Sequence, residues 1–232
     1  TDNSTICGET IDYGPCAFMD QYNHKAVFSS IDFQGRYSYG NQPATIHWNL
    51  IRLAESLLPL IDKDESKSIE IAQKTIDSFS EIFNDKWQIM MRSKLGITDR
   101  SREDEVLIKD LLTWMQSKKP DFTNTFCNLM YGNHAKDEDF EDNDFVIWKK
   151  NWKERVNNND YLNIMKKTNP ILIPRNYLVE EALAEAEIEG KFSKFNELLV
   201  VLSKPYEQLD IDEKYSKTPQ IQAEPYKTFC GT

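Results

Sequence analysis

Apolar residues recur at helical spacing along most of this chain, and that pattern constrains its fold more than any other feature. After Pro43, for example, Ile46, Leu50 and Leu53 fall three or four residues apart and would share one face of a helix. Pro43 suits a first helical turn, because its φ is already helical and the N–H that it lacks would have no partner there. The pattern predicts a helix from this point to about Leu60.

Similar patterns predict further helices, each bounded by glycine, proline or charged residues. The expected helices cover residues 69–95, 103–117, 122–131, 145–156, 179–190 and 191–202. Two prolines flank the apolar residues 171–173, so this stretch is expected to be an extended connector. The predicted fold class is therefore mainly α. The tryptophans on these helical faces are expected to be core residues: Trp48, Trp87, Trp114, Trp148 and Trp152.

The two ends of the chain lack this periodicity. Residues 1–40 are rich in Gly, Pro, Tyr and Asp, which predicts a short strand or hairpin followed by a long ordered loop. Loops of this kind often carry function. Residues 204–232 contain three prolines and are expected to form an irregular tail over the surface. The predicted organisation is a functional loop segment over 1–40, a helical lobe over 41–203 and a tail over 204–232.

Composition excludes several classes of partner. The 232 residues, 40% of them hydrophobic, can bury one large core or two small ones. A formal net charge of -10 argues against nucleic acid as a partner, because binding to phosphate backbones depends on clustered Lys and Arg. No apolar run reaches the length of a membrane span, so no membrane partner is expected. The four cysteines form no C-x-x-C pair and fit a reducing compartment such as the cytoplasm.

The first candidate site is a set of oxygen ligands near the start of the chain, Asp2, Asn3 and Asp12. Carboxylate and amide oxygens suit a divalent metal, and one acid would remain to take a proton from a hydroxyl. Asp and Asn are also common in turns, where they bond their own backbone, so these residue types leave both interpretations open. The Asp12-Tyr13-Gly14 order favours the metal, because it resembles the metal-binding Asp-Phe-Gly of kinases.

Longer strings of residues carry a family resemblance. T-D-N at 1–3 and I-D-Y-G-P at 11–15 are followed by G-R-Y-S-Y-G-N-Q-P at 35–43, which is too long a string to be chance. Further strings are N-P at 169–170, I-P-R-N at 173–176 and Y-K-T-F-C-G-T at 226–232. Over essentially its whole length the chain resembles the selenoprotein O (SelO) family, called YdiU in bacteria.

The resemblance implies a protein-kinase-like fold, of which this chain would supply a C-lobe portion, and a protein adenylyltransferase activity. The family binds ATP turned around relative to kinases and moves AMP to a Ser, Thr or Tyr hydroxyl of a protein. Carried over by motif, Asp2 would be the general base, while Asn3 and Asp12 would hold Mg²⁺ or Mn²⁺ against the phosphates. Two alternatives stay open: kinase-type phosphoryl transfer at the same site, and a non-catalytic pseudokinase-like module for binding or redox sensing.

The resemblance also implies parts that are not in this sequence. The family's Gly-rich segment, its phosphate-binding Lys with a Glu partner and its Arg residues lie in an upstream nucleotide-binding lobe. We therefore expect the chain to be a C-terminal fragment with little or no activity alone. The motif residues Arg36, Tyr37, Asn41 and Gln42 would either bind substrate or fix the loop that follows Asp12.

A redox role rests on the resemblance as well. Some members are thought to couple a C-terminal cysteine to a cysteine in the loop after the metal acid. Cys230 lies in the terminal region, but Phe28 stands where we look for the loop partner, and Cys16 is a nearby substitute. Two unrelated thiols are the favoured interpretation, because sequence separation says nothing about distance. Family members occur in bacterial cytoplasm, which is the expected compartment, with mitochondria as the alternative for a eukaryotic source.

Overall fold

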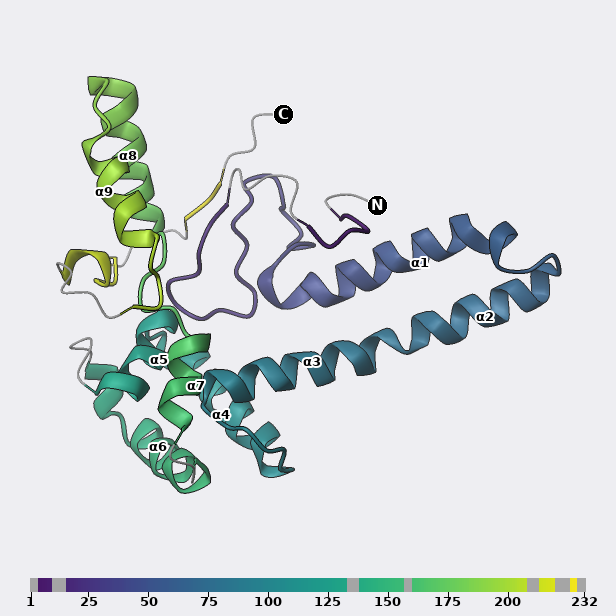
Figure 1. The fold of residues 1–232 in the computed structure, drawn as a ribbon, viewed down its shortest axis with the longest axis horizontal. Coiled ribbons are helices and arrows are strands. Elements are labelled where there is room, and N and C mark those ends of the chain that lie inside the picture. Colours follow the sequence, from purple (N-terminus) through teal and green to yellow (C-terminus); the bar gives the residue numbers. More distant parts are fainter. Residues whose placement is uncertain are drawn as a thin grey trace. The chain divides into compact units, whose positions relative to one another are not determined.

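The computed structural model describes a chain that is mainly α-helical, which confirms the predicted class (Figure 1). The described residues are 4–9, 16–132, 138–156, 160–207, 213–219 and 226–228.

The described part of residues 1–40 is loop and holds no strand, which corrects the predicted strand or hairpin for that part of the chain. Its only ladder contacts are isolated bridges, antiparallel at Gln21–Asp121 and parallel at Ser29–Thr228. No strand lies beside this segment among the described residues, so its backbone groups bond within turns, to other loop segments and to side chains.

The chain divides into two compact units, which are described one at a time. The first consists of residues 1–16, 24–89 and 227–232, and the second of residues 17–23 and 90–226. Both units therefore include residues from the N-terminal loop segment as well as helices.

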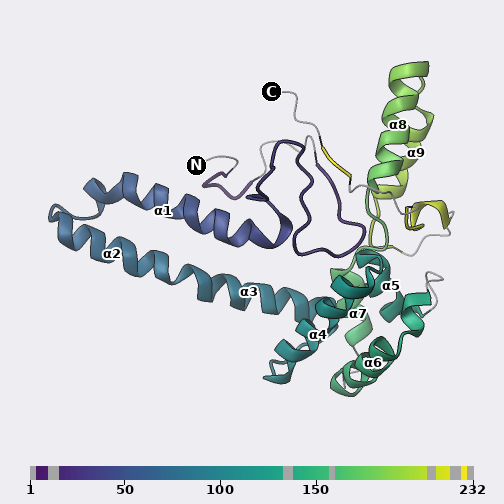
Figure 2. The ribbon, with the colours of Figure 1, turned by 180° about the vertical axis from the view of Figure 1, so that it is seen from behind.

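The first unit is built on a long helical hairpin. The 3₁₀ turn η1 (Tyr39–Asn41) leads into α1 (Gln42–Ile61), and α2 (Glu65–Asp77) returns beside α1, as Figures 1 and 2 show. Ser68, which is buried on α2, donates its hydroxyl to the Leu58 carbonyl of α1 at 2.5 Å. The first predicted helix is thus confirmed.

The structure corrects the second predicted helix, 69–95, by dividing it into α2 and α3 (Phe79–Lys94). Ser78 lies at the break, where its hydroxyl donates to the Thr75 carbonyl at 2.7 Å and its N–H to the Ile76 carbonyl. Serine side chains compete with the backbone for such bonds. The break therefore needs neither the glycine nor the proline on which a sequence prediction relies.

The second unit contains the remaining helices. They are α4 (Glu103–Lys118), α5 (Phe122–Tyr131), α6 (Asn143–Arg155), α7 (Tyr161–Thr168), α8 (Asn176–Glu189) and α9 (Ser193–Leu202). All except α7 were predicted, with ends that agree within three residues. Short 3₁₀ turns occur at Glu138–Glu141 and Glu213–Tyr215. The connector before α8 is not helical, as predicted, and it holds a turn in which the Arg175 N–H donates to the Ile173 carbonyl at 2.8 Å. Among the described helices, none combines the length and the apolar character that crossing a membrane requires.

Aromatic side chains form much of the core of the second unit. Trp114, Phe145, Trp148 and Trp152 make successive ring contacts, with centroids between 4.4 and 6.2 Å apart. All four are buried, so the predicted core role of these three tryptophans is confirmed. Trp48 in the first unit is 39% exposed, and for this residue the prediction was wrong.

Candidate functional site

The residues predicted to bind metal and to act as base, Asp2, Asn3 and Asp12, lie outside the described residues, and so does Cys230. Within the part of the chain that the structure describes, no group of three or more His, Cys, Asp or Glu is placed to hold a metal ion. The candidate site is therefore built from the described segments that adjoin these residues and from the elements that hold them.

The segment directly after Asn3 is anchored to α1. Asn49 is buried on α1, and its side-chain N–H donates to the hydroxyl of Ser4 at 2.8 Å. A second bond closes a turn, because the Thr5 hydroxyl donates to the Glu9 carbonyl at 2.7 Å. The first helix therefore fixes the residue that follows the predicted Asp-Asn pair.

The G-R-Y-S-Y-G-N-Q-P string runs from a loop through η1 into the start of α1, and side chains within it and just before it hold its backbone. The Asp32 carboxylate accepts the N–H groups of Arg36 and Tyr37 at 2.9 and 2.8 Å. The Asn41 amide donates to the Arg36 carbonyl at 2.7 Å, and the Gln42 amide donates to the Tyr37 carbonyl at 3.1 Å. For Asn41 and Gln42, the structure favours the loop-fixing alternative.

The side chain of Arg36 behaves differently, because it lies on the surface. Its guanidinium stacks 4.6 Å from the ring centroid of Trp48, and Arg52 approaches the same ring at 5.4 Å. Such cation–π contacts are worth about 0.5–1 kcal/mol at exposed sites, so they orient the guanidinium without burying it. Arg36 is therefore a motif side chain that stays accessible to a substrate.

The chain's last described residues reach the loop of the first unit. The Thr228 N–H donates to the Phe28 carbonyl at 2.6 Å, and the Ser30 N–H donates to the Thr228 carbonyl at 3.0 Å. The position that faces this segment carries Phe28 and no thiol. Cys16 is an exposed free cysteine. Both interpretations of Cys16 and Cys230, the favoured one of two unrelated thiols and the alternative of a redox pair, stay predictions.

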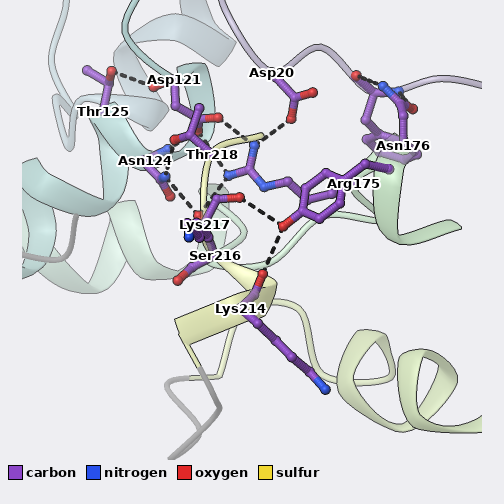
Figure 3. A network of polar contacts seen from close by, with 12 residues as sticks. Asp20, Asp121, Asn124, Thr125, Arg175, Asn176, Lys214, Ser216, Lys217 and Thr218 are labelled. Carbon is purple, nitrogen blue, oxygen red and sulfur yellow. Dashed lines mark hydrogen bonds and ion pairs between the residues drawn. The ribbon is translucent and has the colours of Figure 1, made fainter. Parts of the chain in front are cut away.

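Arg175 is the centre of a buried polar network in the second unit (Figure 3). Its guanidinium is 1% exposed and forms a two-pronged pair with Asp121, which is also 1% exposed; one prong, from Nη2 to Oδ1, measures 3.1 Å. Nη1 also contacts Asp20 Oδ1 at 2.6 Å, and Nη2 donates to the Ser216 carbonyl at 3.2 Å. One arginine thus joins three segments that are far apart in the sequence.

This network holds the loop residues 17–23 against the N-termini of two helices. The Phe122 N–H at the start of α5 donates to the Asp20 carbonyl at 2.7 Å. The Asn176 side chain at the start of α8 bonds both backbone groups of Phe18, at 3.0 and 2.8 Å. The backbone eight residues beyond Asp12 is therefore held in place by hydrogen bonds at Phe18 and Asp20.

Burial controls the electrostatics of the network. Desolvation raises the pKa of Asp20 above its ordinary value, although the Arg175 pair opposes this shift. For Arg175, burial opposes the charged form, but the bonds to Asp121 and Asp20 outweigh it and raise the pKa. The guanidinium therefore stays charged, and its chemistry is that of a positioning group, because two carboxylates and a carbonyl already accept hydrogen bonds from Nη1 and Nη2.

The sequence prediction missed this network. Asp121 follows Pro120 directly before a helix, which is the pattern of an N-cap, and it does cap α5 by accepting the Asn124 N–H at 2.8 Å. Arg175 follows the apolar residues 171–173, and a lone arginine next to such a run was the available signal of a buried charge. Burial of arginine requires paired carboxylates, but nothing in the sequence identifies which ones.

Comparison with known proteins decides the family. A family model described as "Protein adenylyltransferase SelO" matches residues 1–203. The chain belongs to the SelO family. The match includes the strings at 1–3, 11–15 and 35–43, so the resemblance inferred from them is confirmed. It also includes both carboxylates and the arginine of the buried network.

Curated relatives of the SelO chain agree with this assignment. "Protein nucleotidyltransferase YdiU" of Clostridium botulinum (strain Eklund 17B / Type B) is 49% identical to it over 237 residues. The proteins of the same name from Clostridium beijerinckii and Anoxybacillus flavithermus are each 48% identical. In all three comparisons the alignment covers 100% of this chain and 48% of the relative. The chain thus spans about half the length of the curated relatives that it matches.

Proposed function

We propose that this chain is part of a protein adenylyltransferase, which transfers AMP from ATP to Ser, Thr or Tyr hydroxyls of other proteins. The observation that carries the proposal is the SelO family match over residues 1–203, which contains the candidate base and metal ligands. In this proposal the helical units correspond to a C-lobe portion of a protein-kinase-like fold. They act together with the remaining half of the length seen in the relatives.

The proposed step exchanges one P–O bond for another. The acceptor hydroxyl oxygen attacks the α-phosphorus of ATP, and the bond from this phosphorus to the oxygen that bridges to the β-phosphate breaks. Pyrophosphate leaves with the electron pair of that bond. Asp2 takes the hydroxyl proton as general base, which requires its carboxylate to lie within hydrogen-bond reach of the acceptor.

Asn3 and Asp12 are the proposed metal ligands. Their amide and carboxylate oxygens are hard donors of the kind that Mg²⁺ and Mn²⁺ prefer. When bound, such an ion neutralises phosphate charge during the transfer. Both residues must be held at fixed positions for this purpose, because phosphoryl and nucleotidyl chemistry depends mostly on positioning and electrostatics.

The described residues support this proposal through the segments that they hold. The Asn49–Ser4 bond fixes the residue after Asn3, and Asp32 shapes the loop that follows Asp12 in sequence. In the second unit, Arg175 and Asn176 secure the backbone around Asp20. These contacts are what a positioned catalytic segment requires, although they would also serve a binding module.

Labelled ATP tests the proposal. A protein of the relatives' full length, given ATP labelled at the α- or the γ-phosphate with Mg²⁺, should modify protein only with the α label. Asp2→Asn and Asp12→Asn should each reduce the transfer by about 100-fold or more, the range of a lost acid–base or metal contribution. Glu70→Gln makes the same change of charge at an exposed position on α2 and should leave the transfer unchanged.

Other results would favour the alternatives. Transfer of the γ label alone would replace adenylylation by kinase-type phosphoryl transfer. If Asp12→Asn changed neither Mg²⁺ affinity nor any nucleotide-dependent modification, a non-catalytic binding or redox module would be the better assignment. Because the relatives named above are bacterial proteins, we propose the bacterial cytoplasm as the compartment.

A further inference from the structure

An open groove runs between α4 and α6 in the second unit, away from the residues assigned to adenylyl transfer. The two helices are antiparallel, because Arg155 near the end of α6 pairs with Asp104 near the start of α4 at 2.7 Å. Midway, the Trp148 indole N–H donates to the Leu107 carbonyl at 2.8 Å. These contacts fix the spacing of the helices and so define the shape of the groove.

The groove has an apolar floor and exposed apolar walls. Trp114 and Trp148 line its floor and are each 6% exposed. Val106 and Ile147 line its walls and are 59% and 61% exposed. On each helix the lining residues recur every three or four positions, which is the spacing of one helical face. The volume is about 810 Å³.

The rim of the groove is acidic. Four carboxylates line it, Glu103 and Asp110 from α4 and Asp144 and Glu154 from α6. Arg155 is the one cation among the lining residues, and its charge is already matched by Asp104 at 2.7 Å and Asp99 at 3.3 Å. An occupant of this groove therefore meets an apolar centre flanked by more acidic than basic side chains.

We propose that the α4–α6 groove docks an amphipathic helix of a partner protein, with an apolar face flanked by Lys and Arg. Two helical faces that leave apolar side chains exposed are completed by a third helix, the helix-in-groove mode of recognition. Because the groove is open, it would leave much of a small molecule in water, whereas such ligands usually have most of their surface buried.

The length and charge of the occupant follow from the lining. Along α4 the lining extends from Glu103 to Trp114, about 16 Å at 1.5 Å per residue, which corresponds to about three turns of a docked helix. Basic residues beside its apolar stripe would meet the acidic rim, so charge favours this partner and disfavours an acidic one. The proposal does not depend on the adenylyltransferase assignment, because none of its residues is part of that site.

A binding experiment with a designed probe tests this docking site. The probe is a fluorescein-labelled peptide of fifteen residues, with Leu at helical spacing and Lys on both flanks of the stripe. Anisotropy at about 50 mM salt should show saturable binding to the 232-residue chain, and binding should weaken as salt is raised because the charges are exposed. A peptide with Glu in place of every Lys should bind at least about tenfold more weakly.

Matched variants locate the binding. Ile147→Ser in the groove should weaken probe binding about tenfold, the effect of losing roughly one buried aliphatic contact. Val146→Ser should leave binding unchanged, because Val146 is 51% exposed on the same helix but is not among the lining residues. Asp110→Asn should weaken binding, whereas Glu105→Gln, on the same helix but outside the lining, should not. Circular dichroism checks that all four variants keep the helical content of the parent.

Three results would overturn the proposal. One is equal probe affinity in the Ile147→Ser and Val146→Ser variants. Another is binding of the Glu peptide as tight as that of the Lys peptide. The third is concentration-dependent dimerisation in sedimentation that Ile147→Ser abolishes, since this would assign the groove to a second copy of the chain.

Discussion

Arg175→Met should destabilise the second unit more than any surface substitution of a charged residue. The change keeps most of the side-chain length but removes the positive charge between Asp121 and Asp20. Asp121 is 1% exposed, so its carboxylate would be left buried without a counter-charge. Removing one partner of a buried ion pair typically costs about 3–5 kcal/mol, and we expect a loss of stability of this size.

Lys194→Met is the matched control, because it removes a lysine from an exposed pair on the same unit. Lys194 and Glu181 are 3.3 Å apart, with side chains 50% and 54% exposed. Exposed pairs of this kind contribute about 0–1 kcal/mol. Urea unfolding followed by tryptophan fluorescence suits the comparison, since Trp114, Trp148 and Trp152 all lie in the core of this unit.

A second substitution separates the charge from the packing. Adding Asp121→Asn to Arg175→Met removes the stranded carboxylate, and asparagine still serves as an N-cap for α5. The double variant should therefore regain about 1–2 kcal/mol relative to the single one, because an unpaired buried charge costs more than an unpaired amide. The reasoning is refuted if the double variant regains nothing, or if Arg175→Met costs no more than Lys194→Met.

Three further predictions concern pH, thiol reactivity and backbone strain. Burial raises the pKa of Asp20, so the folded state holds this proton more tightly than the unfolded chain does. The stability that Asp20 contributes is therefore present below its ordinary pKa of 3.8 and is lost as the pH rises through the pKa of the folded state. Asp20→Asn should flatten that decline in urea midpoints between pH 3.5 and 7, and an unchanged slope would contradict the assignment. Iodoacetamide should label exposed Cys7 well before buried Cys127. A hydrogen bond from a hydroxyl lowers the pKa of Cys7, whereas burial raises the pKa of Cys127 to about 12. Equal labelling rates by mass spectrometry would disprove this. Gly96→Ala should lower the free energy of unfolding by roughly 1–3 kcal/mol more than Gly190→Ala in the same urea assay. Both glycines have positive φ, but only at position 96 would a Cβ lie 2.8 Å from a carbonyl of α7. Similar losses in the two variants would argue against this contact.

Helical periodicity predicted most of the fold, because the helices bury one apolar face and the face repeats in the sequence. The errors have identifiable physical causes. The break between α2 and α3 at Ser78 uses side-chain hydrogen bonds rather than glycine or proline. The short helix α7 (Tyr161–Thr168) buries only Met165 fully, which is too few apolar positions to produce a repeating pattern.

The buried network was beyond sequence reasoning for a different reason. About a hundred residues separate Asp20 from Asp121, and 54 separate Asp121 from Arg175. The sequence around each of the three residues does not indicate which residues it contacts. Local patterns identify caps and turns, such as Asp121 at the start of α5. They do not identify contacts that depend on how helices pack. The motif strings were sufficient for the family, and the metal and base residues they contain remain predictions.

The motif residues in the described part of the chain are mostly committed to holding the backbone. Asn41, Gln42 and Asn176 direct their amides to backbone groups, and Arg175 directs its guanidinium to the buried carboxylate of Asp121 and the half-buried carboxylate of Asp20. A donor already bonded inside the protein is not available to a phosphate or a peptide without breaking that bond. Arg36 differs from these residues, since its guanidinium lies over the exposed indole of Trp48. A string that identifies the family can therefore consist largely of structural residues, and the strongest candidates for chemistry in this chain remain Asp2, Asn3 and Asp12.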